Sequence, residues 1–232
     1  MWTEVLLLAA GLALLAGFLA ARVDRYRNSR AAVMEFTQSL SPPPQDSHNG
    51  TPDGDLEATP KEAALEEAAN SSQEFDKPGA TLAVLRIPGI HLEVPVLNGT
   101  NALTLNRGVG WIAGTARPGE AGNTGLAGHR DSFFRGLKAV KPGDAIEITA
   151  RNGKFTYVVD QLRIVKPEDL SVLDPGLVPE LTLVTCYPFY YVGNAPRRYI
   201  VTARLADGQS LPANVSASMG PSAAPGLMRS SQ

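Results

Sequence analysis

Short hydrophobic runs of β type follow one another through the middle of the chain, and glycine, proline and asparagine separate them. Asn152-Gly153, between two of these runs, is a type I′ hairpin signal. Seven or more short strands with few helices predict a mainly β domain, either a closed barrel or a sandwich. The candidate strands are Leu82–Ile87, Leu92–Val96, Thr124–Ala127, Ala145–Thr149, Phe155–Val165, Leu181–Cys186 and Tyr199–Leu205.

A different pattern occupies the N-terminus, where Val5–Ala21 is an uninterrupted run of seventeen apolar and small residues. This length is at the short end of the range for a membrane-spanning helix. A cleavable signal peptide is the alternative, but its basic first region is missing, and four arginines follow within the next nine residues (22–30). We therefore expect an uncleaved transmembrane helix.

Between this helix and the strands, residues 41–76 carry nine acidic side chains against one lysine and contain many breakers of regular structure. Thr59 as N-cap, Pro60 and Glu62 form a capping-box pattern that predicts one short helix within this linker. The tail after Ala206 is of low complexity and is predicted to be disordered. The predicted parts are a transmembrane anchor with a juxtamembrane segment (1–40), a flexible acidic linker (41–76), a folded domain (77–206) and a disordered tail (207–232).

Composition narrows the function classes. Residues 77–204 carry fifteen lysines and arginines against ten acids, an excess too small and too scattered for a nucleic-acid surface. The chain has a single cysteine, so that neither an intramolecular disulfide nor a cysteine-based metal site can form. A lone cysteine is most often a small buried apolar residue, so its surroundings must argue for chemistry.

That cysteine, Cys186, ends the strand LTLVTC. Alternation puts Leu181 and Leu183 on one face and Cys186 on the other, just before an irregular loop. Strand ends that open onto loops are places where a rigid scaffold presents a side chain to a substrate.

Two further residue types complete a candidate site. Of the three histidines, His48 lies in the linker and His91 lies between two short strands, whereas His129 ends the run TGLAGH before a polar loop. Arg197 and Arg198 open the last strand, and antiparallel pairing with the cysteine strand would bring one of them close to the thiol. From the residues alone, an ordinary surface or core histidine and two solvated arginines remain the alternatives.

The segments TLVTC, GHRDSFFRGLKAVKPGDAIEI and RRYIV, in this order, resemble the sortase family and look most like its class D members. The similarity covers about residues 82–205. It implies an eight-stranded sortase-type β-barrel with a few short helices. It also implies that Cys186 is the nucleophile of a cysteine transpeptidase, with His129 and Arg198 as its catalytic partners.

The reaction implied by the resemblance is cleavage of a Leu-Pro-any-Thr-Gly or Thr-Ala sorting signal after threonine, through a thioester on Cys186. The acyl group then passes to an amine of a cell-wall precursor or of another protein. His129 would move the protons, and Arg198 would stabilise the oxyanion. The expected partners are secreted proteins with a C-terminal sorting signal, the amine acceptor and membrane lipid around the N-terminal helix, without nucleic acid.

The expected location is the cell membrane, with one span and an extracytoplasmic catalytic domain. The positive-inside rule conflicts with it, because the arginines after the helix would lie in the cytoplasm. A start upstream of Met1 or an override of the rule would remove this conflict.

No cofactor is expected. Some sortases are stimulated by calcium, and Glu168, Asp169, Asp174 and Glu180 precede the cysteine strand, so calcium stays an open alternative. Leu170, Val172 and Leu173 are candidates either for a groove that binds the Leu-Pro part of a signal or for core packing.

Two other functions stay open at this point. A hydrolytic cysteine peptidase would use the same residues but let water resolve the thioester. A catalytically silent, membrane-tethered barrel that only binds would keep the cysteine buried and unreactive. An L,D-transpeptidase is disfavoured because its Ser-His-Gly-Cys neighbourhood is absent.

Overall fold

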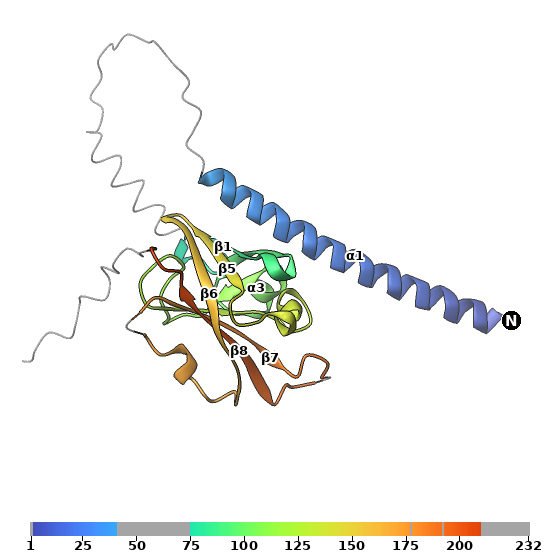
Figure 1. The fold of residues 1–232 in the computed structure, drawn as a ribbon. Helices are drawn as coiled ribbons and strands as arrows, with labels where there is room; N and C mark the ends of the chain where they lie inside the picture. The colour runs from blue at the N-terminus through green and yellow to red at the C-terminus, as the bar shows by residue number, and fades with distance from the viewer. Residues whose placement is uncertain (1, 41–74, 177, 192, 210–232) are drawn as a thin grey trace, which may run out of the picture.

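The computed structural model describes residues 2–40, 75–176, 178–191 and 193–209. The predicted linker helix at residues 59–73 and the predicted tail beyond residue 209 lie outside these ranges. Residues 81–205 form a closed barrel of eight strands in the order β1-β2-β3-β4-β7-β8-β6-β5 (Figure 1). The prediction of a mainly β barrel is confirmed, and the sandwich alternative is wrong.

The strands match the predicted runs closely, with one addition. Seven of them overlap the candidate strands, and β3 is the strand that the hydrophobic pattern did not predict. The strand bounds are β1 Thr81–Ile87, β2 Leu92–Asn98, β3 Val109–Trp111, β4 Asn123–Ala127, β5 Ala145–Ala150, β6 Gly153–Val165, β7 Glu180–Tyr187 and β8 Arg197–Leu205. The helices are α1 Trp2–Ser39 and α3 Ala102–Arg107, and the 3₁₀ turns are η1 Pro88–Ile90, η2 Phe133–Ala139 and η3 Ser171–Leu173.

The hairpin between β5 and β6 lies where Asn152-Gly153 predicted it, with Ala150 paired to Gly153. Its turn type differs from the prediction. A type I′ turn needs positive φ at both central residues, and only Gly153 of the predicted pair has one, at 142°. The hairpin therefore closes over Arg151 and Asn152 in a different turn.

Alternation of side chains along the strands builds the core inside the barrel. Leu181 and Leu183 of β7 are fully buried there, beside Val201 and Ala203 of β8. Tyr157 of β6 is also buried, and its burial raises the pKa of its hydroxyl to about 12. The burial of these apolar side chains is the main contribution that stabilises such a fold.

Two features lie at the N-terminal side of the barrel. Helix α1 contacts β1, β2 and α3 through its second half, where Ser29 and Phe36 are buried, while its apolar first half extends away from the barrel (Figure 1).

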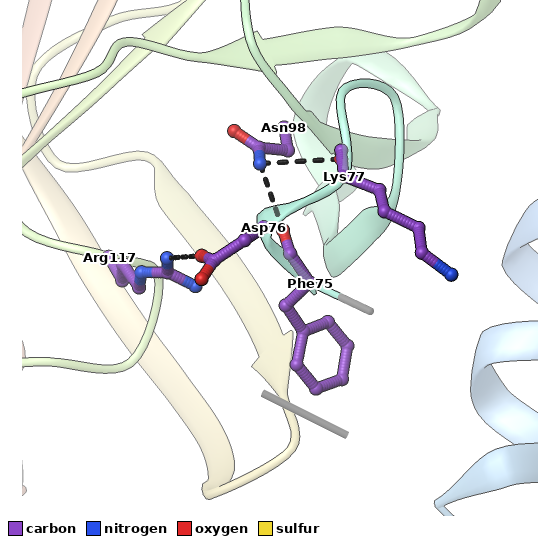
Figure 2. A network of polar contacts seen from close by, with 5 residues as sticks. All are labelled: Phe75, Asp76, Lys77, Asn98 and Arg117. Atoms are coloured by element: carbon purple, nitrogen blue, oxygen red, sulfur yellow. Dashed lines mark hydrogen bonds and ion pairs between the residues drawn. The ribbon is translucent and has the colours of Figure 1, made fainter. Parts of the chain in front are cut away.

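The chain enters the barrel through Phe75–Lys77, where the Asn98 amide donates to the carbonyls of Phe75 (2.9 Å) and Lys77 (3.3 Å), and Asp76 pairs with Arg117 (Figure 2). This network fixes the entry point of the domain.

Candidate active site

Cys186 is the penultimate residue of β7 and is partly exposed. Leu181 and Leu183 point into the barrel, so that Cys186, three residues beyond Leu183, points outward. The predicted alternation of this strand is confirmed. A partly exposed thiol on the outer face of a rigid strand is open to a reacting group, unlike the buried thiol that the silent-barrel alternative requires.

The two arginines that open β8 take different faces. Strands β7 and β8 are antiparallel and lie side by side in Figure 1, with Cys186 directly opposite Arg198 and Tyr187 opposite Arg197. Directly opposed residues share a face, so Arg198 lies on the face of the thiol and Arg197 on the other face. The Arg198 guanidinium donates from Nη1 to the carbonyls of Ala195 (3.3 Å) and Arg197 (3.2 Å).

His129 reaches the same level from the other neighbour of β7. Strand β4 runs parallel to β7, and their register ends with Ala127 beside Val184. Beyond it, the Gly128 amide donates to the Val184 carbonyl (3.1 Å), and the Thr185 hydroxyl donates to the Gly128 carbonyl (2.7 Å). Continued by two residues, this register would place His129 beside Cys186.

The backbone at His129 is held by the turn that follows. The His129 carbonyl accepts from the amides of Ser132 (3.3 Å) and Phe134 (3.2 Å). Gly128 is required next to it, because a Cβ there would lie 2.7 Å from the fully buried ring of Phe134. His129 is partly exposed at the mouth of this fixed turn. The backbone register therefore brings His129, Cys186 and Arg198 to the neighbouring ends of β4, β7 and β8.

The other histidines do not join this site. His91 is exposed after η1, with a positive φ of 52°, in the connection between β1 and β2. His48 lies outside the described residues.

Three aromatic rings, those of Tyr187, Phe189 and Tyr199, pack against one another on the face opposite the thiol, with centroids 5.2–6.2 Å apart. Burial there raises the pKa of Tyr199.

The connection between β6 and β7 covers the outer face of the strands that lead to the site. The Asn123 amide of β4 donates to the carbonyls of Val172 (3.1 Å) and Asp174 (3.2 Å) and pins η3 there. A Cβ on Gly125 would lie 2.9 Å from Leu173 and 3.0 Å from Thr115. The β6–β7 connection, which carries Leu173, and the β3–β4 connection, which carries Thr115, therefore meet over this glycine. Val172 is buried, whereas Leu170 is 67% exposed. Of the three apolar residues that were candidates for a groove or for core packing, Val172 is packed and Leu170 is exposed.

The acids considered for calcium do not gather. Among the described residues, no three histidine, cysteine or acidic side chains form a group that could hold a metal ion. Asp169 instead accepts from the Ser171 hydroxyl (2.6 Å).

Sequence reasoning gave no role to Thr185, Asn123 and Arg130, although all three make the contacts that arrange this region. Arg130 lies in the quoted segment GHRDSFFRGL, which was the available signal for it. Thr185 and Asn123 had no signal of their own, because their partners are backbone carbonyls and distant side chains.

Comparison with known proteins gives consistent similarities. A family model described as the sortase domain matches residues 85–206. Sortase D of Bacillus subtilis (strain 168) is 38% identical over 146 residues, which cover 62% of this chain and 74% of that protein. The structure of a Clostridium perfringens sortase D5 transpeptidase is 26% identical, with a TM-score of 0.59, over 78% of this chain and 99% of that one. The structure of Clostridium perfringens sortase C with the C-terminal cell wall sorting motif is 22% identical, with a TM-score of 0.58, over 77% of this chain and 100% of that one, which is a likeness of fold.

Proposed function

The chain belongs to the sortase family of cysteine transpeptidases, which cleave sorting signals, and we propose that it cleaves a Leu-Pro-any-Thr-Gly or Thr-Ala signal after threonine. We further propose that the acyl group is transferred to an amine of a cell-wall precursor or of another protein. The observation that supports this reaction is the direct opposition of Cys186 and Arg198 on one face, with the His129 turn bonded to the other edge of β7.

The first half-reaction begins with the Cys186 sulfur, whose proton passes to His129. The thiolate attacks the threonine carbonyl carbon and forms a tetrahedral oxyanion, which the Arg198 guanidinium stabilises with its positive charge and its N–H donors. The carbon–nitrogen bond then breaks, and His129 returns its proton to the leaving amine of glycine or alanine. The product is a thioester on Cys186.

The second half-reaction resolves the thioester. An amine attacks the same carbonyl carbon, neutral His129 accepts a proton from it, and the Cys186 thiolate leaves as the new amide forms. Water would give the free acid instead, which is the reaction of a hydrolytic peptidase. Incubation of the protein with a fluorogenic sorting-signal peptide, with and without an added amine, separates the two reactions by their products.

The chain is a membrane-associated enzyme of the cell envelope. We propose that α1 is its anchor, with lipid around the first half of the helix and the barrel outside the cytoplasm. Helix α1 is long and apolar enough to cross a membrane, and side chains such as Leu6 and Leu12 are exposed along it. A C-terminal alkaline phosphatase fusion would be active only outside the cytoplasm, so an inactive fusion would contradict this topology.

The two arginines provide the sharpest test of the proposed site. Loss of a preorganised oxyanion donor typically lowers kcat by about 10² to 10³. The kcat of Arg198→Ala should fall by that much or more with the fold intact. Arg198→Lys should recover little of this kcat, because lysine lacks the planar guanidinium that can donate two hydrogen bonds at once. Arg197→Ala, on the other face of β8, is the matched control and should stay within about threefold of wild type. The reverse order of the two alanine variants in the peptide assay would refute the assignment.

A further inference from the structure

Arg130, the residue after His129, is bonded to the loop that follows the nucleophile. Its Nη2 donates to the carbonyl of Tyr191 at 2.7 Å and to that of Gly193 at 3.0 Å. Its guanidinium carbon lies 5.8 Å from the centre of the Tyr191 ring, within the range of a cation–π contact. The turn after β4 is thereby joined to the loop between β7 and β8.

That loop, described at residues 188–191 and 193–196, runs between the end of β7, which carries Cys186, and the start of β8, which carries Arg198. It leaves β7 after Tyr187 and returns at Arg197, beside Arg198. The Arg198 guanidinium itself donates to the carbonyl of Ala195, near the end of the loop. Two arginines therefore hold one loop, Arg130 at its middle and Arg198 at its end.

The environment of Arg130 indicates that this contact does more than stabilise the fold. Its Nη1 is buried without a hydrogen-bond partner, the one such side-chain nitrogen or oxygen atom in the described part of the chain. A guanidinium keeps its charge, and burying part of it without a partner is unfavourable. Well-packed apolar residues usually stabilise a fold as well as such a group does, so a geometric role explains the arginine better than stability alone.

We propose that Arg130 is a positioning residue for the transpeptidase reaction. It fixes the loop 188–196 against the His129 turn and so holds the Arg198 guanidinium beside the Cys186 thiol. This inference rests on the proposed function, because it takes Arg198 as the oxyanion donor. Arg130 itself need not touch the substrate.

The test uses the full chain, the sorting-signal peptide and two variants of similar length. Arg130→Met removes the donors and should lower kcat about tenfold or more, with KM changed less than threefold. Arg130→Lys keeps donors for the two carbonyls and should return kcat to within about threefold of wild type. Arg204→Ala is the control, because Arg204 forms an exposed ion pair with Asp160 on the outside of the barrel. A wild-type kcat in Arg130→Met, or a loss explained entirely by a smaller folded fraction, would overturn the proposal.

A double variant tests the route through Arg198. If Arg130 acts by positioning Arg198, then Arg130→Met combined with Arg198→Ala should be no more than about twofold slower than Arg198→Ala alone. Multiplied losses would mean that Arg130 acts independently, and they would overturn the proposal.

Hydrogen exchange separates the failure of this inference from the failure of the proposed function. The backbone amides of residues 189–191 and 193–195 should exchange faster in Arg130→Met, whatever the role of Arg198. Unchanged exchange would overturn the contact as a constraint on the loop. A wild-type rate in Arg198→Ala would instead refute the proposed function's use of Arg198, and with it the link between the loop and catalysis.

Discussion

The Thr185 hydroxyl should control both the stability of the barrel and the placement of His129. It is 2% exposed and donates to the Gly128 carbonyl at 2.7 Å, one residue before the histidine. Thr185→Val keeps the shape of the side chain and removes only this donor. The buried Gly128 carbonyl then loses its hydroxyl partner, which should lower the free energy of unfolding by about 1–3 kcal/mol. Urea unfolding measures this loss.

The same change should reduce catalysis in molecules that remain folded. Without the hydroxyl, the hydrogen bond from the Gly128 amide to the Val184 carbonyl is the contact left to hold this residue. The backbone at His129 can then shift. A displacement of about 1 Å in a catalytic group can cost up to about 10²-fold in rate, and we expect a fall in kcat of about tenfold. Thr185→Ser keeps a hydroxyl and should restore most of the activity.

A second threonine of β7 supplies the matched control. The Thr182 hydroxyl is fully buried and donates to the Asn123 side chain at 2.9 Å, away from the His129 turn. Thr182→Val should lose comparable stability but keep kcat within about threefold at a temperature where it is folded. Equal losses of kcat in the two valine variants would refute the link between the Thr185 bond and His129.

Three further predictions address other parts of the structure. Gly128→Ala should lower the free energy of unfolding by about 1–3 kcal/mol, measured in urea, because its Cβ would meet the buried Phe134 ring; wild-type stability would contradict this packing. Burial raises the pKa of Tyr157 from 10.0 to about 12, so the unfolded chain ionises first as pH rises. Stability should therefore fall by roughly 2–3 kcal/mol between pH 10 and 12, and Tyr157→Phe should abolish this part of the fall. Finally, we propose that no cofactor is needed, so a chelator should leave peptide cleavage within about twofold; a larger loss that calcium restores would contradict it.

The sequence pattern predicted seven strands because each contains a β-type run of four or more residues. Strand β3, Val109–Trp111, has three residues, too few for a period to appear, and it was missed. The closed barrel depends on this strand, because β3 bridges β2 and β4. The count of eight therefore came from the family resemblance, while the hydrophobic runs alone gave seven.

The candidate site was predictable to a different degree for each residue. The place of Cys186 at a strand end followed from local sequence, and the separation of Arg197 from Arg198 followed once the two strands were assumed to be antiparallel. The position of His129 did not follow from local sequence, because it depends on the parallel pairing of β4 with β7. These two strands are neighbours in the barrel, but β5 and β6 lie between them along the chain. Spacing along the chain carries no information about such a contact. Their catalytic roles remain predictions until the variants are measured.

The parallel pairing of β4 with β7 also has a consequence during synthesis. His129 emerges 57 residues before Cys186, and β8, which carries Arg198, is the last strand of the barrel. A nascent chain that ends before β8 cannot bring His129, Cys186 and Arg198 together. Strand pairings between segments far apart in the sequence also form slowly. A growing polypeptide therefore carries the Cys186 thiol before Arg198 has been added and before β7 is paired on both sides. We therefore expect peptide-bond cleavage only after β8 has paired with β7.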